Sequence, residues 1–249
     1  MKNLDRPILI TGSGGGIGSA LVDDLLTRGY TKLACQYRTD SPALREVFKL
    51  HGLNFDERCF QADLTDEAQV VDLHDKVTVA LGRGPLWGIV NLAGASSNAM
   101  SWKMPLDKFK SIIDANLTTT FLMCRQVIPE MREAAGGRII NTSSVVAFTG
   151  TVGAAHYCAA KAGVAGLTRA LALELANKNV TANTLALGYF ETGLINHLTP
   201  ALQEDIKAKT PLKRFGHVSE IGGQVDFLLS DEGAFTTGQV IHMNGGIHL

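Results

Sequence analysis

The sequence predicts a single α/β domain built on a doubly wound parallel sheet of about seven strands, with helices on both faces. Three observations predict it. A short apolar run, residues 7–11, leads through a glycine-rich turn into an amphipathic helix. Short apolar runs then alternate with helical segments along the chain, which is the order of elements in parallel sheets. No internal repeat or low-complexity linker divides the 249 residues, so 1–249 is taken as one domain.

The first strand and turn point to a phosphate-binding unit. The run PILIT lies between a proline and Gly12 and has the composition of a buried parallel strand. The turn that follows, residues 12–18, reads GSGGGIG and opens a helix that ends near Gly29. Glycines let the backbone approach a pyrophosphate, and a helix N-terminus supplies N–H groups and a positive dipole end. This order predicts the first unit of a Rossmann-type dinucleotide fold, whereas a plain linker is the alternative.

The end of the second strand, 32–37, bears on which dinucleotide is bound. The strand runs into Gln36-Tyr37-Arg38 and does not end in an acid. An acid at this place bonds the ribose hydroxyls of NAD, whereas an arginine accommodates the 2′-phosphate of NADP. Arg38 therefore favours NADP(H) over NAD(H). The alternative is that Arg38 is a solvated loop residue and that Asp40 is the ribose ligand.

The later elements follow the same rhythm, with one interruption. Strands are expected at 59–62, 86–90, 138–142, 180–186 and 239–243, and helices at 107–135, around Tyr157 and at 219–230. The interruption is 188–212, and a long segment beside a site is typically a functional lid. We expect its apolar side chains to face the substrate: Tyr189, Phe190, Leu194, Ile195 and Leu198. A plain connecting helix is the alternative. The cofactor half then covers about 1–135 and the catalytic half about 136–249.

A serine, a tyrosine and a lysine form the candidate catalytic group. Tyr157 and Lys161 are four residues apart in an alanine-rich stretch, so they share one face of a helix. A nearby ammonium lowers the pKa of a phenol, and a tyrosine tuned toward neutral can transfer protons. Ser144 follows the fifth strand, at the edge where such sheets bind ligands. Taken alone, Tyr-x-x-x-Lys is also common on ordinary helix faces.

Together these motifs resemble the short-chain dehydrogenase/reductase family. The glycine turn fits its spacing as Thr11-Gly12-x-x-x-Gly16-x-Gly18, and Asn91-x-Ala-Gly, Asn116, Ser144, Tyr157 and Lys161 follow in order. The resemblance covers nearly the whole chain. The stretches 139–186 and 211–249 are similar to 3-oxoacyl-[acyl-carrier-protein] reductases of that family. Leu92 and Leu187 depart from it, because the family has a second asparagine and a proline there.

The resemblance implies a role for each site residue. Tyr157 is then the general acid, and Ser144 donates a hydrogen bond to the same carbonyl oxygen. Lys161 lowers the Tyr157 pKa and bonds the nicotinamide ribose, and Asn116 holds a water that links Lys161 to solvent. The residues implied for the cofactor are Thr11, Gly12, Gly16, Ile17, Gly18, Arg38, Asp63 (to the adenine amino group), Leu64, Asn91, Ala93, Gly94, Tyr157, Lys161 and Thr192 (to the carboxamide).

The activity implied is NADPH-dependent reduction of a 3-oxoacyl thioester bound to an acyl carrier protein. Basic residues beside the active-site mouth would meet the acidic carrier: one matching position holds Lys178 and another Ala135, while Arg132, Arg138 and Lys103 could compensate. The alternatives are a CoA thioester, another ketone or secondary alcohol, or a specialised-metabolite intermediate. A dinucleotide-binding protein without turnover and a sugar-nucleotide epimerase rank lower. The resemblance also implies a homotetramer built through 107–135 and the Tyr157 helix.

Composition narrows the partners and the compartment. The net charge is −1 without a basic stripe, so neither nucleic acid nor an acidic membrane surface is expected. The four cysteines have no paired or metal-like spacing, and with no signal peptide or membrane-length apolar stretch this indicates a cytoplasmic protein. The seven histidines form no ligand cluster, so no metal is expected. His156 is expected at the rim of the pocket or in a loop.

Overall fold

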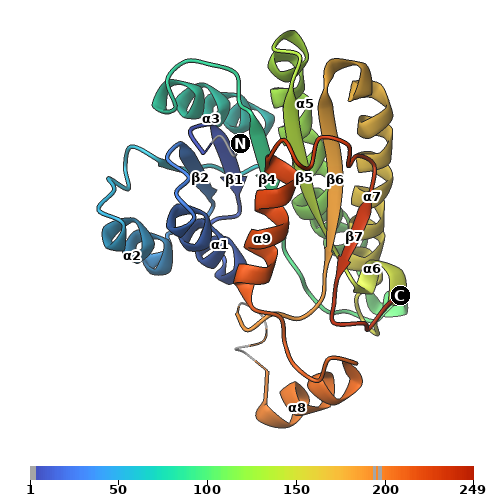
Figure 1. The fold of residues 1–249 in the computed structure, drawn as a ribbon. Helices are drawn as coiled ribbons and strands as arrows, with labels where there is room; N and C mark the ends of the chain where they lie inside the picture. Colours follow the sequence, from blue (N-terminus) through green and yellow to red (C-terminus); the bar gives the residue numbers. More distant parts are fainter. Residues whose placement is uncertain (1–3, 193–194, 196–197) are drawn as a thin grey trace.

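A seven-stranded parallel sheet forms the centre of the molecule (Figure 1). The computed structural model describes residues 4–192, 195 and 198–249. The strands are β1 (Ile8–Thr11), β2 (Leu33–Tyr37), β3 (Cys59–Gln61), β4 (Gly88–Asn91), β5 (Gly137–Ser144), β6 (Val180–Leu187) and β7 (Val240–Met243). They pair in parallel in the order β3-β2-β1-β4-β5-β6-β7. The predicted doubly wound sheet is confirmed, and the expected strand boundaries are within about two residues of the observed ones.

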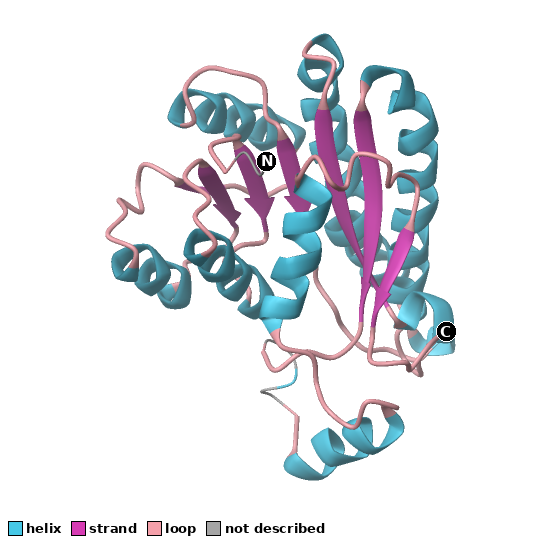
Figure 2. Ribbon diagram, in the orientation of Figure 1, coloured by secondary structure: helices cyan, strands magenta, loops and turns pink. Residues whose placement is uncertain are grey.

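Helices cover both faces of this sheet (Figure 2). They are α1 (Gly16–Thr27), α2 (Pro42–Leu50), α3 (Glu67–Ala80), α4 (Leu106–Ile113), α5 (Thr119–Glu133), α6 (Val146–Thr149), α7 (Ala155–Leu175), α8 (Pro200–Lys209) and α9 (Val218–Leu229), with short helices η1 (Ser101–Lys103), η2 (Asp114–Thr118) and η3 (Ala176–Lys178). α1, α2 and α9 pack on one face, and α3, α5 and α7 on the other. Because both faces are covered, β1 and β6 are buried at every position, which explains their apolar runs.

The sheet topology determines where a ligand can bind. The chain reverses its direction of strand addition between β1 and β4, which are neighbours in the sheet. In open α/β sheets, ligands bind at such a switch point, outside the carboxyl ends of the strands. Figure 1 shows these ends pointing toward α8. The carboxyl edge is therefore where the site is to be sought.

The expected helix 107–135 is not one regular helix. α4 and α5 are joined by η2, a π-helical turn that contains Asn116. The Asn116 side chain donates from Nδ2 to the carbonyl oxygen of Ile112 at 2.9 Å. In an α-helix that oxygen would accept from the Asn116 N–H, and asparagine side chains compete for backbone partners in this way. The polar residue in mid-helix thus coincides with a local widening that hydropathy alone does not predict.

The segment 188–212 contains both loop and helix. α8 begins after Thr199, whose side chain caps it by accepting from the Leu202 N–H at 3.4 Å. Phe190 has its ring buried against Gly216, in the core shared with α1 and α9, and it also lines a cavity at this end of the sheet, so the expectation that it faces the substrate stays a prediction. Leu194 lies outside the described residues.

Candidate active site

The glycine turn joins the ends of β1, β4 and α1. Gly12 has φ +67°, and a Cβ there would lie 2.6 Å from the Ala93 nitrogen, so glycine is required. Gly16, Ile17 and Gly18 form the first turn of α1, which has no acidic residue and no side-chain cap. Its N–H groups are therefore available to an anion, as a pyrophosphate site needs. The turn fits a dinucleotide on this ground.

A buried glutamine that the sequence analysis missed holds this turn in place. Gln36 accepts from the Gly12 N–H at 2.9 Å through Oε1, and its Nε2 donates to the Ala62 carbonyl at 2.7 Å. The side chain thus connects the turn to the end of β3. A polar amide inside the otherwise apolar strand β2 was the available signal, because a buried amide needs partners.

The polar residues after β2 and β3 differ in whether their side chains are already bonded to another residue. Asp40 pairs with Arg45, whose Nε donates to its carboxylate at 2.9 Å. Arg38 is exposed beside them. Asp63 accepts from the Thr65 hydroxyl at 2.7 Å and the Thr65 N–H at 2.9 Å, and these bonds lower the pKa of its carboxyl. Asp63 is thus held charged at the end of β3, followed by the buried Leu64.

Two residues at the end of β4 make hydrogen bonds to the neighbouring strands β1 and β5. Ala93 donates its N–H to the Thr11 hydroxyl at 3.3 Å, which ties β4 to β1. Asn91 is buried, and its Nδ2 donates to Asn141 Oδ1 at 2.9 Å. The Asn91 side chain therefore points into a polar network between β4 and β5 and is closed off from solvent.

Ser144 and Tyr157 meet at the carboxyl edge, but the expected effect of Lys161 on the phenol is wrong. Burial raises the pKa of Tyr157, and the hydrogen bond with Ser144 lowers it by less. Lys161 instead directs its ammonium to the Thr142 carbonyl, 3.0 Å away, and lies 5.8 Å from the centroid of the Tyr157 ring. Tyr157 is consequently held protonated in this arrangement.

Lys161 is enclosed between α7 and β5. It is 4% exposed, and its backbone carbonyl accepts from the Ser143 hydroxyl at 2.7 Å. Burial lowers the pKa of its ammonium to about 8, because the low-dielectric surroundings disfavour the charged form. The lysine can therefore hold or release a proton near neutral pH.

Asn116, in η2, also lies near Gly94 and the Lys161 ammonium. Besides Ile112, its Nδ2 bonds the Ala95 carbonyl at 2.8 Å, while its buried Oδ1 has no partner among the described residues. A Cβ on Gly94 would lie 2.5 Å from this Oδ1 and 3.4 Å from Lys161 Nζ. The asparagine oxygen and the lysine ammonium thus both lie close to Gly94, and the oxygen leaves no room for a Cβ there.

The whole chain can now be compared with known proteins. A sequence profile described as short chain dehydrogenase matches residues 6–203. The chain belongs to the short-chain dehydrogenase family. It is accordingly an NAD(P)-dependent oxidoreductase acting on CH–OH groups, and it binds a nicotinamide dinucleotide.

Full-length relatives of this short-chain dehydrogenase carry several names. Nodulation protein G of Azospirillum brasilense is 35% identical over 240 residues, covering 96% of this chain and 97% of its own. Acetoacetyl-CoA reductase of Acinetobacter sp. (strain RA3849) is 34% identical, covering 97% of each chain. The 3-oxoacyl-[acyl-carrier-protein] reductase FabG of Staphylococcus aureus is 34% identical, covering 99% of each. These names agree on the family but not on one substrate.

His156 of this short-chain dehydrogenase is neither at a rim nor in a loop. It is fully buried on α7, and its Nε2 lies 3.0 Å from the Ser97 hydroxyl. The bond ties α7, directly beside Tyr157, to the segment that follows β4. Helix geometry places this side chain about 100° away from Tyr157, but the local pattern gives no sign of the segment that covers it.

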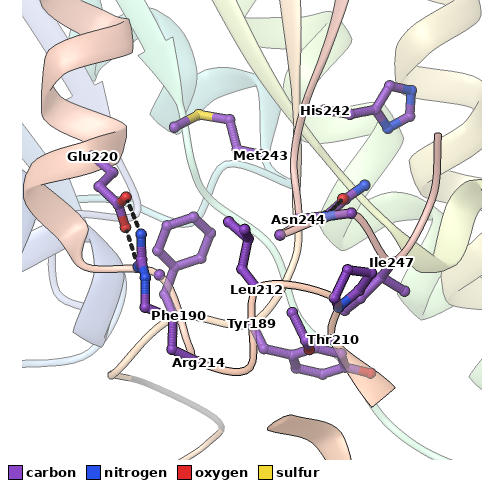
Figure 3. Close-up of a pocket in the computed structure, with 14 residues that line it drawn as sticks. Tyr189, Phe190, Thr210, Leu212, Arg214, Glu220, His242, Met243, Asn244 and Ile247 are labelled. Carbon is purple, nitrogen blue, oxygen red and sulfur yellow. Dashed lines mark hydrogen bonds and ion pairs between the residues drawn. The ribbon is translucent and has the colours of Figure 1, made fainter. Parts of the chain in front are cut away.

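A cavity of about 490 Å³ opens beside the segment 188–212 (Figure 3). Its walls are the end of β6, the loop 210–216 and the C-terminal residues, with apolar side chains from Tyr189, Leu212, Met243 and Ile247. Met243 pairs with Leu187 and Leu187 with Ser144, so the cavity lies at the same edge of the sheet as Ser144, and its wall residue Met243 is two strands away from that serine. Arg214 and Glu220 close one wall as an ion pair of 2.7 Å.

Most of the basic residues considered for a carrier protein lie at the other edge of the sheet. Arg132 and Ala135 precede the start of β5, and Lys178 precedes the start of β6. Arg138 is buried on β5, so it cannot compensate at the mouth as expected. Lys103, in η1 after β4, is at the carboxyl side of the sheet.

In the described part of the chain, no group of three or more His, Cys, Asp or Glu side chains could hold a metal ion. None of the helices in this part combines the length and the apolar character that a membrane crossing requires. Thr192, a candidate for the carboxamide, is partly buried and donates its N–H to the Phe190 carbonyl at 2.7 Å.

Proposed function

We propose that this enzyme reduces the 3-oxo group of an acyl thioester bound to an acyl carrier protein, with NADPH as the hydride donor. One arrangement supports it most. Tyr157, Ser144 and Lys161 meet at the carboxyl edge of the sheet, with the phenol bonded to the serine and the ammonium buried. A protonated phenol beside a second hydroxyl is suited to give a proton to a carbonyl oxygen.

Tyr157 and Ser144 have different roles toward the carbonyl oxygen of the substrate. Bound NADPH supplies the hydride to the carbonyl carbon. Tyr157 gives its proton to the carbonyl oxygen, and Ser144 donates a hydrogen bond to the same atom, so the developing charge meets two fixed donors. The raised pKa keeps Tyr157 protonated before the step, as a general acid must be.

Lys161 and Asn116 restore the proton on Tyr157. We propose that Asn116 Oδ1, a buried acceptor without a partner among the described residues, takes a hydrogen bond from a water that also bonds the Lys161 ammonium. Buried waters typically bind polar groups that lack another partner. Because the Lys161 pKa lies at about 8, the ammonium can pass a proton inward and be recharged from solvent through this water.

The NADPH preference rests on the residues after β2. Asp40 is engaged by Arg45, which argues against it as the ribose ligand. Arg38 is exposed and next to Asp63, whose pKa it helps to lower. A guanidinium there is suited to a 2′-phosphate, which it can bond in bidentate fashion.

A CoA thioester is the second candidate substrate. The specific observation in its favour is that Arg132 and Lys178 lie at the amino edge and Arg138 is buried, so within one protomer Lys103 alone of the residues considered could meet an acidic carrier at the mouth. For either thioester, we place the acyl chain in the cavity of Figure 3, which adjoins the catalytic edge. A homotetramer remains our proposal, supported by exposed apolar residues such as Phe121 on α5 and Leu173 on α7.

The test compares one 3-oxoacyl group on two carriers. Loss of absorbance in the reduced-nicotinamide band is followed with the acyl group on acyl carrier protein and on CoA, each with NADPH and with NADH. Turnover with NADPH and a higher kcat/KM on the carrier protein is the expected result. A preference for the CoA ester would favour the second candidate, and no turnover of either thioester while NADPH binds would overturn the substrate class.

A further inference from the structure

A second pocket lies at the amino edge of the sheet, away from the catalytic residues. Its volume is about 230 Å³, and it is lined by Trp87, Ala135, Gly136, Arg138, Asn179, Asp231 and Ala234. Arg138 is the second residue of β5 and Ser144 is the last. With a rise of about 3.3 Å per residue, the two are separated by roughly 20 Å. The pocket is therefore distinct from the cofactor and substrate sites.

Arg138 is a buried cation in the lining of this pocket. It is 4% exposed, and its Nη1 donates to the carbonyls of Gly137 at 2.9 Å and Asn179 at 3.2 Å. Nε is sealed from solvent without a partner. Nη2 also has no partner among the described residues, and unlike Nε it is not sealed. Because an arginine stays charged when buried, its free N–H groups on Nη2 remain as donors toward the pocket.

The charges around Arg138 do not balance. The carboxylate of Asp231 is bonded to Arg6 at 2.8 Å. The guanidinium carbons of Arg6 and Arg138 lie 3.7 and 4.6 Å from the Trp87 ring centroid. Among the described residues, two guanidinium groups and one carboxylate thus lie around Trp87, with Arg138 and Asp231 in the pocket lining and Arg6 outside it, which leaves one positive charge in excess. Trp87 offers only its ring, since its Nε1 donates to the Leu229 carbonyl at 2.8 Å.

We infer that this pocket binds a small oxyanion, a phosphate or a carboxylate, through the Nη2 donors of Arg138. A buried charge without a partner is costly, and an anion with hydrogen-bond acceptors relieves that cost. The volume is below the range of about 300–1,000 Å³ typical of pockets for larger ligands, so a nucleotide does not fit. The bound anion lies against Trp87, which makes the site observable.

Trp87 fluorescence tests the site directly. The chain has two tryptophans, and Trp102 is exposed, so Trp102→Phe leaves Trp87 as the reporter. Inorganic phosphate and acetate are titrated separately into this variant of the full chain, at constant ionic strength kept with chloride. Saturable change with phosphate identifies that ligand, and saturable change with acetate alone identifies a carboxylate. The variant Trp87→Phe, which retains Trp102, is expected to show no change.

Two substitutions at the rim give opposite expected shifts. Asp231, 54% exposed, loses its charge in Asp231→Asn, which frees Arg6 and is expected to tighten binding about threefold. Arg6→Gln frees the Asp231 carboxylate to compete for Arg138 and is expected to weaken binding about threefold. Neither is expected to alter turnover. No saturable change with either anion, or shifts of the same sign in the two variants, would overturn the inference.

Discussion

Asn116 Oδ1 and Lys161 Nζ, from two different helices, approach Gly94 so closely that a Cβ there would lie 2.5 Å from the oxygen and 3.4 Å from the nitrogen. We expect Gly94→Ala to displace the Asn116 side chain, because its methyl group would clash with the asparagine oxygen. The expected result is a fall in kcat of about 10²-fold or more, the range for a disturbed proton transfer. Steady-state kinetics and fluorescence titration of NADPH measure turnover and binding separately.

The matched control for that variant is Gly166→Ala on α7. Nothing lies within 4 Å of a Cβ built there. Replacing a glycine within a helix stabilises the protein by about 0.5–1 kcal/mol, so we expect unchanged kcat and a slightly higher melting temperature. A similar loss of kcat in both variants would point to general disturbance of the fold.

Tyr157→Phe removes the proposed acid and keeps the ring. We expect turnover to fall by at least about 10²–10⁴-fold, while NADPH still binds, since Lys161 keeps its bond to the Thr142 carbonyl. Ser144→Ala is expected to lose less, because Tyr157 can still give its proton. Turnover close to that of the parent enzyme in Tyr157→Phe would contradict the assignment of the acid.

Lys161 links stability to pH through its lowered pKa, about 8 in the folded protein against 10.5 for the free side chain. Below pH 8 the lysine is protonated in both states, so the cost of burying its charge is fully present. Between these two pKa values the folded state releases the proton while the unfolded state retains it, so this contribution to stability rises with pH, by on the order of 3 kcal/mol. Urea unfolding of the parent and Lys161→Met from pH 7 to 10.5 measures it, and a constant difference between them would contradict the pKa assignment.

Arg38 is expected to distinguish the two nicotinamide cofactors. Arg38→Ala removes the group proposed for the 2′-phosphate, so NADPH binding should weaken by about 10–100-fold, the value of one charge-assisted contact of roughly 1.5–3 kcal/mol. NADH binding should change little. Lys49→Ala, which removes a nearby exposed charge on α2, is the control for general electrostatics. If Arg38→Ala weakened the binding of NADPH and NADH equally, Arg38 would not be the residue that determines the preference for NADPH.

The cavity of Figure 3 is expected to limit the acyl chain. Leu212→Trp enlarges a half-exposed wall residue, so KM should rise several-fold for a long 3-oxoacyl thioester and stay nearly constant for acetoacetyl-CoA. Leu202→Trp on α8, which does not line the cavity, provides the comparison. A KM for the long substrate that is insensitive to Leu212→Trp would place the chain elsewhere.

The parallel sheet and the order of the site motifs could be predicted from the sequence. The strands are recognisable because a strand buried on both faces is a nearly continuous apolar run, such as PILIT. The sequence also brought Ser144 and Tyr157 together correctly. It could not give the direction of the Tyr157 pKa shift. Helical spacing places Lys161 on the same face as the phenol, but the ammonium is directed by a carbonyl of β5, Thr142, and such a contact between distant segments leaves no spacing pattern.

Two other features depended on segments that only the fold brings together. His156 was expected at a rim because nothing in the local pattern announces that Ser97 will cover it. Arg138 was considered for the active-site mouth as a basic residue that could compensate for the one missing at position 135. A strand is extended, however, and carries its two ends to opposite edges of the sheet.

The π-helical turn that holds Asn116 has a consequence for the motions of the enzyme. Residues 114–118 interrupt an otherwise α-helical stretch that continues from Leu106 to Glu133. Proteins open locally in units of different stability, and a π-helical turn interrupts the regular ladder of helix hydrogen bonds. We therefore expect amide hydrogen exchange along this stretch to be fastest near the turn and slower toward the buried middle of α5. Local opening there would release Asn116 from its place beside Gly94 without unfolding the domain.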